Sequence, residues 1–283
     1  MTAPARTRFA PSPTGYLHLG HAFSALVAAG TAERLGGEML LRIENIDQGR
    51  CRPEFESAIH EDLTWLGLTW PTPVRRQSDH FADYAAALAQ LDAAQVLYPC
   101  FCTRAEIRTE IARSPTAPHG PDGPIYPGTC RNLGATDVAD RKARGDAFAL
   151  RLNCIKAIGL VGDDLFFEDA MQGRHAADPT KFGDVVLARK DTPTSYHLAV
   201  TVDDHLQGIT CVTRGADLFE ATHVHCLLQR LLGFSTPYYA HHRLIADADG
   251  QRYAKRDQAA TLRDMRSQGL TPEDVRALLP PLP

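Results

Sequence analysis

Hydrophobic and polar positions change their period repeatedly along the N-terminal part of the chain. Thr7-Arg8-Phe9-Ala10 is a short strand candidate, and a cluster of proline, serine, threonine and glycine at 11–15 ends it. An alanine-rich stretch at 19–35, closed by two glycines, predicts a helix. The apolar run at 39–43 is typical of a strand covered on both faces, and Pro53 opens another helix. This β-α-β-α series predicts an α/β fold with a parallel sheet.

The middle of the chain has shorter elements. Strands are expected at 147–152 and 165–167, and residues 114–124 form a loop with four prolines and two glycines. Thr103 and Glu106 have the spacing of a capping box at the start of a short helix. A segment of this kind predicts a small insertion carried on a larger domain.

Longer elements flank this segment on both sides. Helices are expected at 79–95 and 217–232, and strands at 183–189 and 196–202. Thr271, followed by proline, caps a final helix. The alternation of strands and helices therefore resumes after the insertion.

Composition limits the class of protein. The 283 residues are 44% hydrophobic and 23% charged, with a formal net charge of −4, which excludes collagen-like, coiled-coil and disordered chains. No apolar stretch reaches the roughly 18 residues of a membrane span, and no signal peptide opens the chain, so a cytoplasmic protein is expected. Because the chain is not basic, an RNA partner would need a local patch, such as the cations around Arg243, Lys255 and Arg263. A monomer is the simplest expectation.

The strongest local signal is His18-Leu19-Gly20-His21, between the first strand and the first helix. Free N–H groups at a helix start favour phosphate, and Gly20 permits close approach of a ligand to the backbone. His18 and His21 lie three residues apart and so share a helix face, where both could contact a phosphate. Alternatively, both histidines serve only as helix-cap residues.

At this point the sequence resembles a known family. Residues 8–15 followed by His18-Leu19-Gly20-His21 resemble the opening of glutamyl-tRNA synthetases, which are class I enzymes. The resemblance continues, in order along the chain, through four further blocks: Leu41-Arg42-Ile43-Glu44-Asn45-Ile46-Asp47, Asp62-Leu63-Thr64-Trp65-Leu66-Gly67-Leu68, Val202-Asp203-Asp204-His205-Leu206-Gln207-Gly208 and Arg214-Gly215-Ala216-Asp217-Leu218. The order of these blocks makes the match far more specific than any one of them.

The resemblance implies a Rossmann-like catalytic core with a small zinc-bearing α+β insertion and a short helical C-terminal part. The expected division is 1–96 with 186–240 for the catalytic domain, 97–185 for the insertion and 241–283 for the C-terminal segment.

The resemblance also implies the substrate sites. It puts Arg8, Ala10 and Ser12 beside L-glutamate, with Glu44 facing the ammonium group. Tyr196 and Arg214 complete this glutamate site, with Arg214 as a carboxylate partner. ATP is expected at His18, Gly20, His21 and Lys255, with Mg²⁺ on its phosphates. Fixed cations suit a substrate with two carboxylates, although Arg8 and Arg214 could instead form structural ion pairs and Glu44 could lie on a solvated strand end.

A second class I signature, the lysine motif, is expected near Arg252-Tyr253-Ala254-Lys255-Arg256. It departs from the usual form at Arg252 and Ala254, so only the ATP contact of Lys255 is carried over. A solvated basic loop is the alternative. The implied chemistry is attack of glutamate on the α-phosphate of ATP, with His18, His21 and Lys255 as the catalytic residues around the phosphates.

The seven cysteines include a tight pair, Cys100 and Cys102, and Cys130 lies in the same predicted insertion. Three thiolates in a segment too small for a strong core suggest structural zinc, which needs a fourth ligand. His119 is the generic choice, whereas Tyr126, four residues before Cys130, matches a zinc pattern in a truncated branch of the family. The alternative is three ordinary thiols.

The length of the chain favours that truncated branch. Only residues 256–283 follow Lys255, which leaves no room for the helical domain with which full-length glutamyl-tRNA synthetases read the anticodon. The resemblance then implies transfer of glutamate to the queuosine base in the anticodon loop of tRNA(Asp). Two alternatives remain: acylation of a tRNA 3′ end, and a non-catalytic RNA-binding paralogue.

Overall fold

The core of the protein is a parallel sheet. The computed structural model describes residues 4–113, 119–121, 123–162, 164–245 and 260–283. On one side of the sheet β1 (Arg6–Phe9) pairs with β2 (Glu38–Ile43), which pairs with β3 (Arg75–Arg76), all in parallel.

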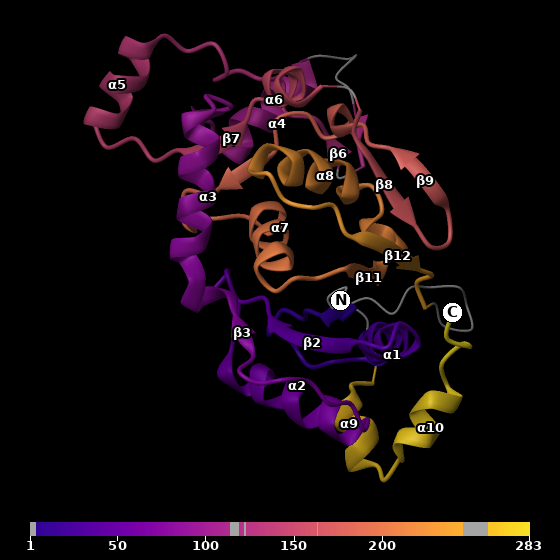
Figure 1. Cartoon of the computed structure of the whole chain (residues 1–283). Coiled ribbons are helices and arrows are strands. Elements are labelled where there is room, and N and C mark those ends of the chain that lie inside the picture. Colours follow the sequence, from indigo (N-terminus) through magenta and orange to yellow (C-terminus); the bar gives the residue numbers. More distant parts are fainter. Residues whose placement is uncertain (1–3, 114–118, 122, 163, 246–259) are drawn as a thin grey trace.

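The other half of the sheet begins beside β1. There β11 (Cys211–Gly215) is joined to the first strand by a hydrogen bond from Thr210 N to Arg6 O of 3.0 Å. Next to β11 come β12 (Tyr238–His242) and β8 (Phe166–Asp169), both parallel, and then the antiparallel β9 (Gly173–Ala176) (Figure 1). The α/β fold with a parallel sheet is confirmed.

Neighbouring residues of a strand point to opposite faces of the sheet, and in β1 they contact a helix on each face. The Thr7 hydroxyl donates to Ala28 O, 2.8 Å away in α1 (Leu19–Arg34). Arg8 points the other way, to Asp204 in α7 (Tyr196–Leu206). The sheet therefore lies between α1 and α7 at this point, and the charged residues of β1 face α7.

The expectation of a strand at 196–202 is wrong, because this segment forms the first turns of α7. The Ser195 side chain caps the helix by accepting from Leu198 N at 3.4 Å. Every residue from Leu198 to Asp204 is buried, so the segment has no amphipathic period that marks it as a helix. Its β-branched Val200, Thr201 and Val202 favour a strand by local propensity, and tertiary packing overrides that preference.

The segment 97–185 contains a second, antiparallel sheet. Its central strand β7 (Ala149–Leu152) pairs with β4 (Leu97–Cys100) and, directly beyond the segment, with β10 (Val186–Ala188). Thr103 and Glu106 form the expected capping contacts at α4 (Arg104–Arg113). The other elements in this part are β5 (His119–Gly120), β6 (Gly123–Pro124), α5 (Ala135–Ala143), which projects at the upper left of Figure 1, and α6 (Cys154–Val161). By contrast, β8 and β9 of the same segment join the core sheet.

The remaining helices agree with the sequence pattern in most of their length. The helix expected at 217–232 begins as a 3₁₀ turn and is α-helical only in its later part, and Gly233 ends it with φ of 72°. The Thr271 side chain caps the final helix as expected. The bounds are α2 (Pro53–Trp65), α3 (Phe81–Ala93), α8 (Ala221–Leu232), α9 (Leu262–Ser267) and α10 (Pro272–Ala277), with 3₁₀ turns at Gln77–His80, Pro179–Lys181 and Ala216–Leu218.

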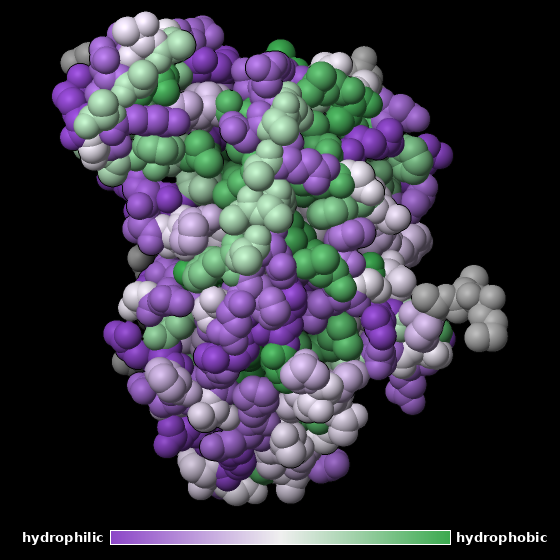
Figure 2. Space-filling view, turned by 60° about the vertical axis from the view of Figure 1, so that its left-hand side comes forward, coloured by the Kyte–Doolittle hydropathy of each residue, from purple (hydrophilic) through white to green (hydrophobic). Residues whose placement is uncertain are grey.

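Two large hydrophobic clusters hold these layers. One joins α1, β2, α2 and the C-terminal helices through residues such as Leu41, Leu63 and Met265. The other joins α3, α6, α7 and α8 through residues such as Leu91 and Leu227. On the face shown in Figure 2, hydrophobic residues gather in the upper half and hydrophilic residues in the lower half. Among the described residues, no helix combines the length and the apolar composition needed to cross a membrane.

Candidate active site

A cavity of about 530 Å³ opens where the carboxyl ends of β1, β2 and β11 meet. Ligands commonly bind at this edge of a parallel α/β sheet. The structure brings together here every described residue that the sequence assigned to glutamate or ATP: Arg8, Ala10, Ser12, His18, Gly20, His21, Glu44, Tyr196 and Arg214. Lys255 lies outside the described residues.

The two histidines sit at the start of α1. His18 is the N-cap residue, and its Nδ1 accepts from Gly20 N at 3.1 Å, while His21 Nδ1 accepts from His18 N at 3.2 Å. The two imidazole rings are in contact, with centres 3.9 Å apart and planes inclined by 42°. A Cβ atom at Gly20 would lie 2.9 Å from His18 Cε1, so glycine keeps this arrangement possible. Both histidines cap the helix, and both also line the cavity.

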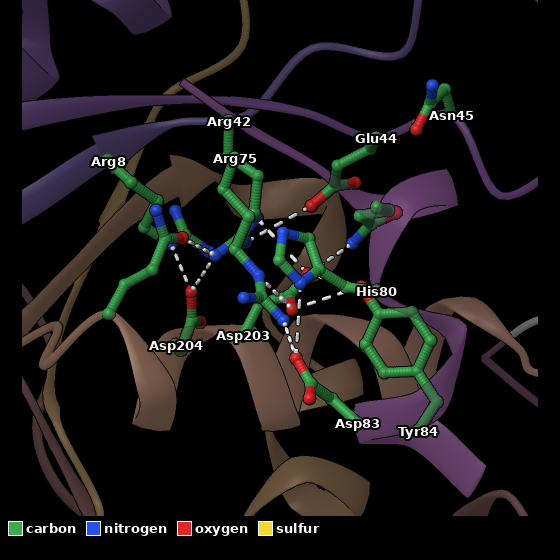
Figure 3. A network of polar contacts seen from close by, with 12 residues as sticks. Arg8, Arg42, Glu44, Asn45, Arg75, His80, Asp83, Tyr84, Asp203 and Asp204 are labelled. Carbon is green, nitrogen blue, oxygen red and sulfur yellow. Dashed lines mark hydrogen bonds and ion pairs between the residues drawn. The ribbon is translucent and has the colours of Figure 1, made fainter. Parts of the chain in front are cut away.

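Beneath the cavity lies a chain of buried charges that continues from β1 to β2 (Figure 3). Arg8 Nε and Arg42 Nη1 both donate to Asp204 Oδ1, at 3.0 and 2.7 Å, and Arg42 Nη2 donates to Glu44 Oε1 at 3.2 Å. Burial alone would raise the pKa of Asp204, but the two guanidinium groups outweigh it and lower the pKa. For Glu44 burial dominates and raises the pKa despite Arg42. A cation entering the cavity beside Glu44 would therefore stabilise its ionised form.

A neighbouring carboxylate anchors this chain to the rest of the core. Asp203 accepts from Arg75 Nε at 2.7 Å, Gln77 Nε2 at 2.8 Å and the Tyr84 hydroxyl at 3.0 Å. Burial raises the pKa of Tyr84, so its hydroxyl remains a donor. Asp203 thereby holds β3 and α3 against α7.

The sequence-based assignment included Arg8 and Glu44 but missed Arg42 and Asp204. One signal for Arg42 was available, because a cation inside the apolar run of β2 requires a buried partner.

The Arg214 guanidinium forms hydrogen bonds with side chains that carry no negative charge. Its Nε donates to His241 Nε2 at 3.0 Å and its Nη2 donates to Thr222 Oγ1 at 2.6 Å. Its Nη1 lies 3.1 Å from His225 Nδ1. In the part of the chain that the structure describes, no carboxylate forms an ion pair with Arg214, whereas Arg8 pairs with Asp204. Of the three arginines that line the cavity, Arg8, Arg214 and Arg243, Arg8 is therefore paired with a buried carboxylate, whereas Arg214 is buried without one.

The residues on either side of 246–259, the range that contains the lysine motif, lie at or near the cavity. Leu244 and Ile245, which follow β12, line the cavity. Thr261 forms an isolated antiparallel bridge with His18, and Leu262 N donates to Leu17 O at 2.8 Å. The residues that flank the lysine motif therefore lie beside the two histidines.

The three cysteines of the expected metal site lie together in the segment 97–185. Their sulfur atoms are all within 4.8 Å of one another, and Cys102 Sγ is 3.5 Å from Cys130 Sγ. The Tyr126 hydroxyl lies 3.4 Å from Cys100 Sγ and 3.7 Å from Cys102 Sγ. Ligands of a tetrahedral zinc ion with Zn–S of about 2.3 Å lie about 3.8 Å apart, so the four groups fit a metal of this size.

The pKa values of the groups in this cluster are shifted in different directions. Burial opposes ionisation of Cys100, but hydrogen-bonding interactions with Tyr126 and Arg151 outweigh it and lower the pKa of this thiol. Burial raises the pKa of Cys102 to about 11 and also raises that of Tyr126. The side chain of His119 lies outside the described residues.

A second cavity, of about 950 Å³, lies between the cysteine cluster and the core domain. Its cationic residues outnumber its carboxylates, with Arg50, Arg104, Arg151, Arg189 and Lys190 against Asp47 and Asp191. Arg50 and Arg189 are paired with these carboxylates at 2.7 and 3.0 Å. The surplus of positive charge suits an anionic ligand.

The family follows from a comparison with known proteins. A family model described as the catalytic domain of class I tRNA synthetases (E and Q) matches residues 4–279. The chain belongs to this family. It is therefore a ligase of the aminoacyl-tRNA synthetase type, whose substrates are ATP, an amino acid and tRNA.

Curated relatives in this class I family carry two names. The chain is 48% identical to Glutamyl-Q tRNA(Asp) synthetase of Rhodobacter capsulatus, over 96% of this chain and 99% of the relative, and 44% identical to the protein of that name from Nocardia farcinica, over 96% and 82%. It is 38% identical to glutamate–tRNA ligase of Aquifex aeolicus, over 95% of this chain and 55% of the relative. The resemblance found in the sequence is confirmed.

The fold of solved class I synthetases is also similar. A glutamate tRNA ligase from Elizabethkingia meningosepticum, solved in complex with its amino acid, superposes with a TM-score of 0.74 at 28% identity. The superposition covers 94% of this chain and 53% of the ligase, so the chain corresponds to about half of that enzyme.

Proposed function

We propose that this chain activates L-glutamate with ATP and transfers it to the queuosine base in the anticodon loop of tRNA(Asp). The observation that supports the amino acid is the cavity with an uncompensated Arg214 and a buried Glu44, which suits a substrate with two carboxylates and one ammonium. The observation that supports the acceptor is the name shared by relatives that the chain matches over up to 99% of their length. We further propose that the enzyme acts as a monomer in the cytoplasm, where ATP and tRNA are available.

In this proposal Arg8, Ala10, Ser12, Glu44, Tyr196 and Arg214 bind glutamate. His18, Gly20, His21 and Lys255 bind ATP, with the two imidazoles and the Lys255 ammonium beside the phosphates. Mg²⁺ bound to ATP would neutralise phosphate charge when the nucleotide enters. The residues of this chain hold the glutamate carboxylate within reach of the α-phosphate and stabilise the charge that develops there, and neither task requires a covalent enzyme intermediate.

We assign the acceptor RNA to the side of the molecule that carries the second cavity. Its surplus cations, Arg104 and Lys190 among them, would contact phosphates, and such contacts would weaken as salt rises. Arg243, at the rim of the first cavity, would extend the contact toward the reacting atoms. Arg263 and Arg266 are less available, since they contact the Tyr16 hydroxyl at 2.6 Å and Glu61 at 2.9 Å.

We also propose that zinc is the metal of the cysteine cluster, with Cys100, Cys102, Tyr126 and Cys130 as ligands. Its role would be structural, because it would tie β4 to the loop before α5 in a segment that lacks a large core. The division into domains at 97 and 185 belongs to the same proposal.

The decisive experiment follows labelled glutamate in the presence of ATP and purified tRNA(Asp), with and without queuosine. Transfer only to the queuosine-containing tRNA is expected, and the product should survive removal of the tRNA 3′ end. Acylation of tRNA(Glu) at its 3′ end would favour the glutamate–tRNA ligase activity instead. Absence of glutamate-dependent ATP–pyrophosphate exchange, with or without tRNA, would contradict an enzymatic function.

A further inference from the structure

The Arg214 guanidinium has no charged partner among the described residues, although its side chain is buried. Three of its five N–H groups are used on His241, Thr222 and His225. A buried cation without a carboxylate carries a large desolvation cost, which an anionic ligand would offset. The protonation states of His225 and His241 therefore determine the orientation of the Arg214 guanidinium and the charge around it when a ligand binds.

His241 is held as a neutral acceptor. Its Nδ1 lies 2.6 Å from Asp169 Oδ2, and both side chains are fully buried. Asp169 accepts from the backbone N–H groups of Met171, Gln172 and His241, so its carboxylate acts as an acceptor, Nδ1 carries the proton, and Nε2 is left to accept from Arg214 Nε. Burial and the nearby Arg214 lower the pKa of His241 to about 4.

His225 is a neutral acceptor of the opposite tautomer. Arg214 can only donate, so His225 Nδ1 accepts, and the proton on Nε2 points to His197 Nδ1 at 3.1 Å. Burial, followed by the charge of Arg214, lowers the pKa of His225 well below its ordinary value. A second proton on either ring would put another cation beside Arg214.

We propose that His225 and His241 are positioning residues that orient Arg214 through neutral acceptors and thereby keep its charge available for the side-chain (γ) carboxylate of the substrate. They would then help to select glutamate over glutamine, because a neutral amide leaves the buried guanidinium uncompensated. Arg8 differs, because Asp204 already neutralises it. This inference rests on the proposed function, in which Arg214 binds a carboxylate of glutamate.

A pair of substitutions at one position separates charge from packing. His225→Gln keeps a neutral acceptor, so the KM for glutamate in ATP–pyrophosphate exchange should rise by no more than about fivefold. His225→Glu places a carboxylate beside Arg214 that competes with the substrate, so this KM should rise by about 30-fold or more. The KM for ATP should stay within about threefold in both, and the preference for glutamate over glutamine should fall only in His225→Glu.

His223 provides the matched control. It lies two residues earlier in α8, is equally buried, and faces Asp178 N at 3.0 Å and Lys181 Nζ at 3.3 Å rather than Arg214. His223→Gln and His223→Glu should change the KM for glutamate by less than about threefold. The inference is overturned if His223→Glu matches the effect of His225→Glu, or if a folded His225→Glu protein keeps the wild-type KM.

A measurement on the unaltered protein covers the case in which His225→Glu does not fold. With ¹⁵N-labelled histidine, NMR at pH 7 should show His241 neutral with its proton on Nδ1 and His225 neutral with its proton on Nε2. The His225→Gln and His241→Gln spectra would assign these signals, and a doubly protonated ring at either position contradicts the inference. If wild-type protein shows no glutamate-dependent exchange, the proposed function fails, and this inference with it. If wild-type exchange persists and His225→Glu is unaffected, this inference alone fails.

Discussion

Thr261 pairs with His18 in an isolated antiparallel bridge at the start of α1. The pairing brings residues that are distant in sequence to the proposed ATP site. Leu244 and Ile245, which precede the range 246–259, lie in the wall of the cavity. Lys255 belongs to that range, so the position of its two flanks is consistent with the ATP contact proposed for it.

Replacement of Lys255 should therefore abolish activation without affecting the fold. In Lys255→Ala we expect kcat/KM for ATP in glutamate-dependent pyrophosphate exchange to fall by about 100-fold or more, because a charge that stabilises the phosphates is lost. Lys142→Ala, on α5 and away from the cavity, is the control and should retain activity within about twofold. Equal activities of the two variants would remove Lys255 from the catalytic residues.

Loss of the Asp204 carboxylate should destabilise the whole protein. Asp204→Asn leaves Arg8 and Arg42 buried without their shared anion, so the free energy of unfolding should fall by about 3–5 kcal/mol. Urea unfolding followed by circular dichroism measures this loss. Asp191→Asn, whose exposed carboxylate pairs with Arg189, should cost less than about 1 kcal/mol. A similar small loss in Asp204→Asn would show that the buried network contributes little.

Asp62 predicts a dependence of stability on pH. Both of its carboxylate oxygens are buried without a hydrogen-bond partner among the described residues, and burial raises its pKa from 3.8 to about 6. The folded protein therefore binds this proton more tightly than the unfolded chain does. Stability from this group is fully present below about pH 4 and is lost as the pH rises through about 6.

Asp62→Asn should remove that dependence. At pH 7 the substitution should stabilise the protein by up to about 3 kcal/mol, and near pH 4 by little, as measured by urea unfolding at both pH values. Glu61→Gln is the control, since Glu61 is an exposed neighbour that also contacts Arg266. A destabilised Asp62→Asn protein at pH 7 would mean that the 3.6 Å contact with Arg266 outweighs desolvation.

The metal site predicts one zinc ion per chain. Cys130→Ser should lower zinc content, measured by mass spectrometry of the metal, and Tyr126→Phe should lower it more than His119→Ala. Loss of the metal should also lower the thermal stability of the segment 97–185, since the proposed metal would contribute to folding there. Cys154→Ser is the control, because this buried thiol lies outside the cysteine cluster. An equimolar zinc content that persists in Cys130→Ser would contradict the ligand set.

Much of the cavity could be predicted because its residues follow strand ends. Ala10 comes directly after β1, Ser12 two residues later and Glu44 directly after β2, so the ends of the two expected strands agree with the glutamate contacts that the family resemblance implied. The helix that His18 caps was recognisable from its apolar length and its closing glycines. The N-terminal half of the site could therefore be predicted from local sequence features.

The remaining contacts join residues that are far apart in sequence. Arg8 and Asp204 are separated by 196 positions, and no spacing rule connects them. The sequence of α7 predicts a strand, because burial on all sides removes the helical period of its hydrophobic and polar residues. His225 and His241 carry no motif, and their tautomers depend on Asp169 and His197, which only the folded chain brings near. These features follow from tertiary packing.

The pairing of β8 with β12 has a practical consequence for shortened versions of the protein. Asp169 ends β8 and fixes the ring of His241, although it belongs to the segment that carries the cysteine cluster. A deletion that removes 97–185 as a block would take this carboxylate away and leave His241 free to rotate. A minimal amino-acid-activating core should therefore retain 165–176 as a graft on the edge of the sheet.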